Sequence, residues 1–180
     1  MSGRINSLQL LATYNKVMNV QIYEATSRLS FEELSFDRQA FFGSILGTLN
    51  HLVVGDTIWL KRFSQQEPHH FYLQAIAQLE MPTALNQILF ANLSMLSERR
   101  KMLDEAILLW MGHLQDYDLD GSLSYINTKG VHSTKAVSEV LLHIFNHQTH
   151  HRGQLSTLLF QAGVDVGTTD LISLIPDQEI

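Results

Sequence analysis

The histidines are the residues of this sequence whose type and spacing are best suited to chemistry. Four of its nine histidines, His143, His147, His150 and His151, fall in one short segment. If that segment is helical, His147 and His151 are offset by about 40° and about 6 Å along the axis, so they project from one face. Two such imidazoles can bind one metal ion. The same spacing also arises on a surface by composition alone, or in a core hydrogen bond.

A metal site would need a third ligand from another helix, because catalytic sites commonly combine three protein ligands with one position for water. His51 is the best candidate, since it lies among apolar residues where a buried imidazole requires a partner. Gly47 and Gly55 lie four residues before and after His51 and share its face. They either leave space for a substrate above the metal or only allow close packing of helices.

The other histidines are weaker candidates. His143 lies on the same helix face as His147, so it either replaces His151 as a ligand or serves as a nearby acid or base. His150 points about 100° away from His151 and should stay outside the site. The remaining four fall in or near predicted connections, where a solvated side chain is the ordinary explanation: His69, His70, His113 and His132.

Apolar residues that recur with helical spacing predict the elements that must position these side chains. They predict four long helices, at 7–29, 40–63, 83–114 and 137–162. The segment 69–80 is compatible with a short helix or an ordered loop.

Two shorter features complete the predicted fold. Ser30 and Glu33 have the spacing of a capping box, which predicts one short helical turn. A β-hairpin is predicted around the turn residues 127–130. The predicted fold class is all-α, a four-helix bundle with a small hairpin or loop insertion before the last helix, in one domain spanning 1–180.

Composition excludes several classes of function. The chain has 180 residues, 45% of them hydrophobic, and a formal net charge of −6, which disfavours binding to nucleic acid. It has no cysteine, so a metal must be bound by nitrogen or oxygen ligands. Charged residues and histidines interrupt every apolar run, and the N-terminus begins no signal peptide. We therefore expect a cytoplasmic protein without a membrane partner.

Three segments resemble motifs of the DinB family, the DinB/YfiT-like four-helix metalloproteins. Residues 146–154 resemble the family pattern N-H-x-x-x-H-R-G-Q on the last helix. Residues 50–59 are similar to its pattern N-H-x-x-x-x-D-x-x-W on the second helix, and residues 14–19 to Y-N-x-x-x-N on the first. The three segments occur in the family's order, and the resemblance covers nearly the whole chain.

The resemblance implies a ligand set and several possible functions. It implies that His51, His147 and His151 hold one divalent transition-metal ion, with zinc slightly ahead of nickel. Some relatives are metal-dependent transferases or isomerases that use a low-molecular-weight thiol, and here that thiol must come from outside. The alternatives are a metal-dependent hydrolase, or a non-enzymatic stress-response protein that binds a metal or small ligand. The resemblance also implies a homodimer.

Four further polar residues have open roles. Asp56 lies about 140° round the helix from His51, so it should orient a neighbour instead of binding the metal. Asn15 and Asn19 share a face and either line the cavity or hydrogen-bond between helices, the second being the simpler explanation. Arg152 either binds an anionic substrate group or pairs with an acid on an adjacent helix.

Overall fold

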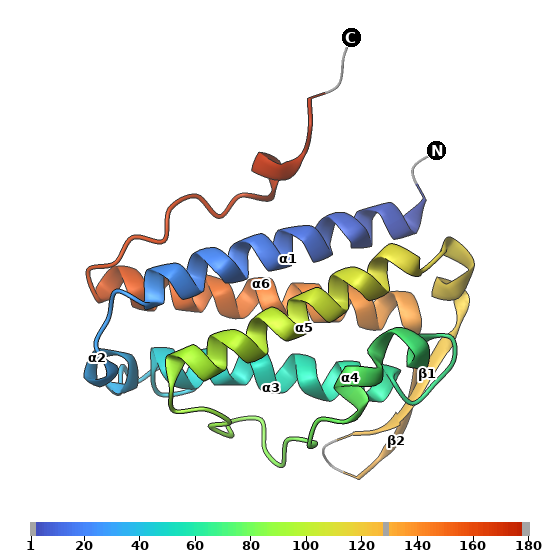
Figure 1. The fold of residues 1–180 in the computed structure, drawn as a ribbon, viewed down its shortest axis with the longest axis horizontal. Helices are drawn as coiled ribbons and strands as arrows, with labels where there is room; N and C mark the ends of the chain where they lie inside the picture. Colours follow the sequence, from blue (N-terminus) through green and yellow to red (C-terminus); the bar gives the residue numbers. More distant parts are fainter. Residues whose placement is uncertain (1–2, 128–129, 178–180) are drawn as a thin grey trace.

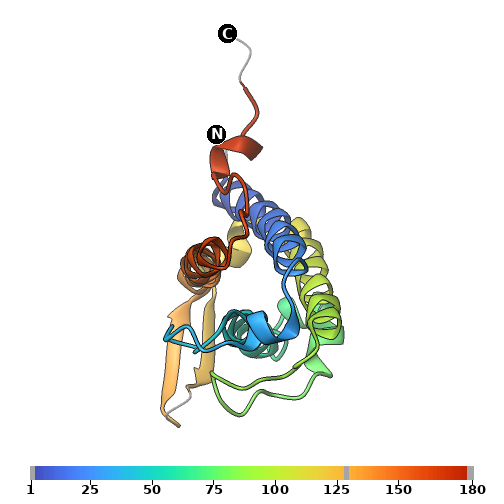
Figure 2. The same ribbon diagram turned by 90° about the vertical axis from the view of Figure 1, so that its left-hand side faces the viewer.

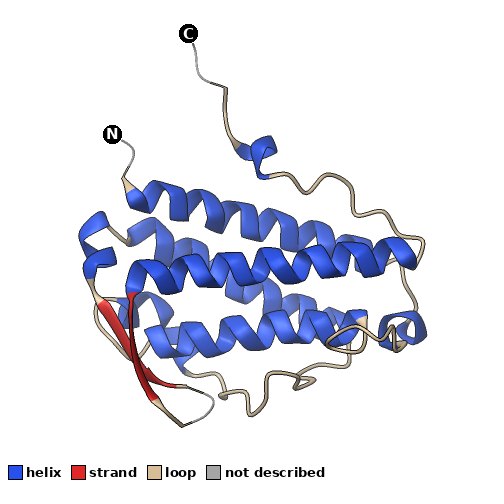
Figure 3. Ribbon diagram, turned by 180° about the vertical axis from the view of Figure 1, so that it is seen from behind, coloured by secondary structure: helices blue, strands red, loops and turns tan. Residues whose placement is uncertain are grey.

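The computed structural model describes residues 3–127 and 130–177. This part of the chain is mainly helical, as the sequence predicts, with one two-stranded sheet (Figures 1 and 3). The helices are α1 (Arg4–Thr26), α2 (Phe31–Ser35), α3 (Ile45–Phe63), α4 (Gln74–Ala77), α5 (Leu93–His113) and α6 (Val137–Gln161). The strands are β1 (Ser122–Ile126) and β2 (His132–Ala136), and short 3₁₀ turns cover His69–Leu73, Asp116–Asp120 and Leu171–Leu174.

The four long helices lie side by side, and each packs against two of the others. Helix α1 contacts α5 and α6, and α3 contacts the same two helices from the opposite side. Figure 2, which views them nearly end on, shows this arrangement around a common interior. None of the described helices combines the length and hydropathy that a membrane span requires.

Helix α3 is the most enclosed element, because almost all of its side chains are buried. It contacts α5 and α6, and it is also covered by α2, α4 and β1. Ser44 begins the helix by accepting a hydrogen bond from the backbone N–H of Gly47, the usual role of an N-cap serine. The start predicted at residue 40 is therefore wrong by five positions, because residues 40–43 form a tight turn before this cap.

Helix α5 also begins later than predicted. Residues 83–92 are an irregular segment, and α5 starts after Asn92, whose side chain accepts a hydrogen bond from the N–H of Met95. The buried amide of Asn50 holds this segment by donating to the carbonyl of Phe90 and accepting from its N–H. These tertiary hydrogen bonds outweigh the helical pattern of the apolar residues.

The shorter predicted features are present. Ser30 and Glu33 form the capping box of α2. Strands β1 and β2 pair in antiparallel register, from Ser122 opposite Ala136 to Ile126 opposite His132. Two residues of the predicted hairpin turn, 128 and 129, lie outside the described residues. Segment 69–80, which the sequence left open, contains a 3₁₀ turn followed by the single turn of α4.

Candidate metal centre

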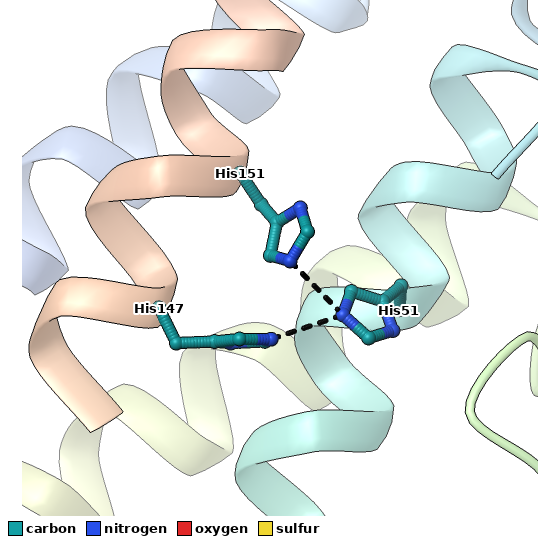
Figure 4. A group of neighbouring side chains, drawn as sticks. All are labelled: His51, His147 and His151. Carbon is teal, nitrogen blue, oxygen red and sulfur yellow. Dashed lines mark hydrogen bonds between the residues drawn. The ribbon is translucent and has the colours of Figure 1, made fainter. Parts of the chain in front are cut away.

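Three histidines from two helices converge on one point. His51 comes from α3, while His147 and His151 come from α6, and their rings face one another across the space between these helices (Figure 4). Nε2 of His51 lies 3.0 Å from Nε2 of His147 and 3.2 Å from Nε2 of His151. Nitrogens bound tetrahedrally to one zinc ion are about 3.3 Å apart. The three side chains predicted as ligands are therefore together, at nearly the separation that a shared ion requires.

The hydrogen bonds of the Nδ1 atoms of His51 and His151 determine which ring nitrogen of each carries the proton. Nδ1 of His51 is 2.8 Å from the backbone carbonyl of Leu85, and Nδ1 of His151 is 2.7 Å from Oε1 of Gln154. Carbonyl oxygens accept hydrogen bonds and cannot donate, so each Nδ1 carries the proton and donates. Each Nε2 is then left with a lone pair, and the two lone pairs oppose each other across 3.2 Å. A cation between them would turn this repulsion into binding.

Burial keeps the three imidazoles neutral at pH 7. Burial and, to a smaller extent, the neighbouring His151 and His51 together lower the pKa of His147 to about 3. Burial also lowers the pKa of His51, against the opposing effect of its hydrogen bond to Leu85, and it lowers the pKa of His151. Because only a neutral imidazole has a lone pair for a metal, the site favours the ligand form.

The two glycines that flank His51 serve different purposes. A Cβ atom on Gly55 would lie 3.1 Å from Cε1 of His147, so the absence of a side chain there gives the His147 ring its place. A Cβ atom on Gly47 would instead collide with the backbone carbonyl of Phe42. Gly47 therefore makes room for the turn that precedes α3, a role that neither sequence interpretation gave it, whereas Gly55 lets the His147 ring of α6 approach α3 closely.

An aromatic ring covers one side of His51. Phe42 stacks on it with 3.7 Å between ring centroids and 17° between planes. Phe42 belongs to the turn before α3, so the Ser44 cap that ends this turn also places the ring. Phe42 and the Leu85 carbonyl were not identified from the sequence as parts of the site. Both lie in segments that were predicted to be helical.

A pocket of about 310 Å³ leads away from His51 and His147. Its size is at the lower end for a small-molecule site. The wall is aromatic and apolar, with a few polar groups, and is formed mainly by α3, α6 and the hairpin. Besides the two ligands it includes Gly55, Ile58, Trp59, Arg62, Leu85, Tyr125, Asn127 and His143.

Comparison with known proteins agrees with this geometry. The model of the DinB family matches residues 1–179. The chain belongs to the DinB family. It is also similar to Protein DinB of Bacillus subtilis (strain 168), with 29% identity over 160 residues, which cover 89% of this chain and 88% of that protein.

Within this DinB-family chain, the other two histidines of α6 lie outside the three-histidine group. His143 is exposed at the pocket wall, with its ring 5.8 Å from that of His147 and 5.3 Å from that of Trp59. His150 accepts a hydrogen bond from Gln154. Among the described residues, the group consists of His51, His147 and His151 and has no fourth protein ligand. It thus has the open arrangement of catalytic sites.

Asp56 points away from the histidines, as predicted, and enters a buried ion-pair cluster. Its carboxylate is 2.8 Å from the guanidinium of Arg100, which also lies 3.0 Å from the carboxylate of Asp104. All three side chains are at most 3% exposed. The cluster joins α3 to α5 through one buried guanidinium that contacts two buried carboxylates.

Two buried amides of α1 extend this cluster to α6. Asn15 and Asn19 donate hydrogen bonds to Asp104 at 3.1 and 2.9 Å, and Asn15 accepts one from Arg152. The expectation that the two asparagines hydrogen-bond between helices is therefore confirmed. Arg152 is buried and donates to amide oxygens and to the hydroxyl of Thr149, and within the described part of the chain it forms no ion pair with an acid, contrary to one of its two predicted roles.

His69 corrects the expectation of a solvated side chain. It is only 3% exposed, and its Nδ1 accepts a hydrogen bond from Nε1 of Trp110 at 3.2 Å. Its ring also contacts Phe63. His69 is thus a core residue that satisfies the buried indole N–H, which the sequence could not indicate without knowing that segment 69–73 packs on α5.

Proposed function

We propose that this protein binds one divalent transition-metal ion through His51, His147 and His151. The observation that carries the proposal is the pair of unprotonated Nε2 atoms of His51 and His151, which face each other at 3.2 Å. Three imidazole ligands suit zinc and nickel alike. Zinc is the first choice and nickel the second.

We further propose that the four long helices form the family's four-helix bundle in a single domain, and that the bound ion serves transfer of a low-molecular-weight thiol to an electrophile. An ion held by the three neutral imidazoles would supply Lewis acidity that lowers the pKa of a thiol and so makes it a better nucleophile at neutral pH. The chain has no cysteine, so the thiol is a second substrate. The pocket beside His51 and His147 gives it access.

The pocket wall contains a base for proton transfer. Of the described residues that line it, none is a carboxylate, but the exposed imidazole of His143 could accept a proton from a thiol. The same imidazole could accept a proton from water in the alternative hydrolysis, so the two reactions are separated by experiment. Gly55 and the aromatic wall leave space for the electrophile.

The first test is the metal content of tag-free protein. Wild-type protein and the control His113→Ala, at an exposed position at the end of α5, should retain about one equivalent of zinc or nickel. His51→Ala and His147→Ala should lose it while their circular dichroism stays helical. Absence of metal in the wild type after dialysis against divalent ions would refute the proposal.

The second test separates the possible reactions. Metal-loaded protein should accelerate the reaction of a low-molecular-weight thiol with an electrophile such as monochlorobimane, and the acceleration should vanish in His147→Ala. Cleavage of esters or amides without thiol would identify a hydrolase instead. Metal binding without either activity would indicate a non-enzymatic role.

A further inference from the structure

Arg62 lies at the wall of the pocket against two aromatic rings. Its guanidinium carbon lies 4.5 Å from the centroid of Trp59 on α3 and 4.3 Å from that of Tyr125 on β1. Both rings and Arg62 line the same pocket as His51 and His147. The two rings meet edge to face at 75°, so the guanidinium cannot lie flat on both, but its contacts with both rings confine the cation to this part of the pocket wall.

No acid neutralises this charge. Among the described residues, the ion pairs involve Arg4 and Arg100, and the hydrogen bond of Arg62 goes to the backbone carbonyl of Ile126 at 3.3 Å. Lys135 and Glu139 line a neighbouring hollow, and Glu139 forms no ion pair with Arg62. Burial lowers the pKa of Arg62, yet a guanidinium remains charged at neutral pH. A partly desolvated cation without a counter-charge is a site for an anion.

The distance between the guanidinium of Arg62 and the three histidines sets the length of a ligand that could contact both. His51, Gly55 and Arg62 lie on one face of α3, and the rise from His51 to Arg62 is roughly 16 Å. The side chain of Arg62 leans back over Trp59, three residues earlier, which shortens the gap between guanidinium and histidines to the order of 10 Å. Such a ligand must be extended.

We infer that Arg62 binds the carboxylate of an elongated substrate whose thiol end reaches the group His51, His147 and His151. The inference rests on the proposed function, because it assigns a role to the far end of a molecule that is held by the metal. A carboxylate matches the fork of the guanidinium edge and can accept two parallel hydrogen bonds. Arg62 would therefore select anionic thiols over neutral thiols of the same length.

The test measures binding of three thiols to cobalt-loaded protein by calorimetry, with the thiolate-to-cobalt absorption band as proof that sulfur reaches the metal. The probes are mercaptohexanoate, the neutral mercaptohexanol of equal length, and mercaptoacetate, which is too short to span the gap. The variants are Arg62→Met and a matched control, Arg99→Met. Arg99 is likewise a half-buried cation, 5.3 Å from the ring centroid of Phe90, but it lies on α5 in a separate hollow.

Wild-type protein and Arg99→Met should bind mercaptohexanoate about tenfold more tightly than mercaptohexanol, as a charge-assisted pair provides. In Arg62→Met this preference should fall to less than about twofold, with cobalt content and thermal unfolding unchanged. Mercaptoacetate should show no loss of affinity in that variant. Equal binding of the two long probes by the wild type would overturn the inference, as would failure of both to give the band.

Both of those negative results would leave metal binding intact. A wild-type protein that takes up no cobalt would instead refute the proposed function, and the inference with it. An anion preference that survives in Arg62→Met but disappears in Arg99→Met would place the carboxylate elsewhere and overturn the assignment.

Discussion

Gly55→Ala should weaken metal binding while leaving the fold as stable as before or more so. The added Cβ would lie 3.1 Å from Cε1 of His147, whereas ordinary contacts begin at 3.4 Å. The ring must then move by about 0.3 Å, which exceeds the roughly 0.2 Å within which metal–ligand distances are held. Displacement of an orienting contact by this amount should cost about tenfold in zinc affinity. Alanine in the interior of α3 should at the same time add up to about 1 kcal/mol of helix propensity.

Competition with a chromophoric zinc chelator measures the affinity, and urea unfolding of the metal-free protein measures the stability. Gly153→Ala is the matched control, because Gly153 lies in the interior of α6 and a Cβ there meets nothing within 4 Å. It should gain a similar stability and bind zinc as tightly as the wild type. If Gly55→Ala also binds zinc like the wild type, the contact with His147 does not set the ligand geometry and the reasoning is refuted.

Three further outcomes follow from burial and hydrogen bonding. The pKa of His147 is 6.5 in the unfolded chain and about 3 in the folded chain. The unfolded state therefore binds more protons between these pH values, so the unfolding free energy of metal-free protein should fall as the pH drops through them. Urea titrations at pH 7 and 5 should show a smaller fall in His147→Asn than in the wild type, and equal falls would contradict this. Arg100→Met leaves two buried carboxylates without their cation and should lower the unfolding free energy by about 3–5 kcal/mol. Arg4→Met, at an exposed ion pair, should leave the unfolding free energy nearly unchanged. Similar decreases for the two variants in urea unfolding would refute the distinction between the buried and the exposed pair. Gln154→Leu removes the acceptor that keeps the proton on Nδ1 of His151, so the zinc affinity should fall about tenfold. An unchanged affinity would show that the hydrogen bond to Gln154 does not determine the tautomer of His151.

The grouping of the three histidines could be predicted in part because their positions on the helices follow from local periodicity, while their role as metal ligands stays a proposal. The spacing of His147 and His151 places both on one face of any helix, and the apolar neighbours of His51 imply an inward side chain. That α3 and α6 are adjacent did not follow from spacing, and it was supplied by the resemblance to a family. The predicted domain extent and the homodimer stay predictions.

The parts of the site that were missed depend on tertiary contacts. Segment 83–92 has apolar residues at helical intervals, but Asn50 binds the backbone of Phe90 and holds the segment as a loop. The carbonyl of Leu85 reaches His51 because of this. His69 and Arg62 likewise depend on side chains far away in sequence, Trp110 and Tyr125. No periodicity of the chain encodes such partners.

The buried ion-pair cluster also fixes the axial register of α3 and α6, the two helices that carry the three histidines. Asp56 follows His51 closely on α3 and pairs with Arg100 on α5. Arg152 follows His151 directly on α6 and donates to Asn15 on α1, and Asp104 contacts both Arg100 and Asn15. A slide of α3 by one turn, about 5.4 Å, would separate Asp56 from Arg100 and His51 from His147 together. The axial register of α3 and α6 is thus fixed by Asp56 and Arg152, which lie about one turn from His51 and directly after His151. A variant in which α3 has shifted along its axis would therefore lose metal binding although its helix content stays unchanged.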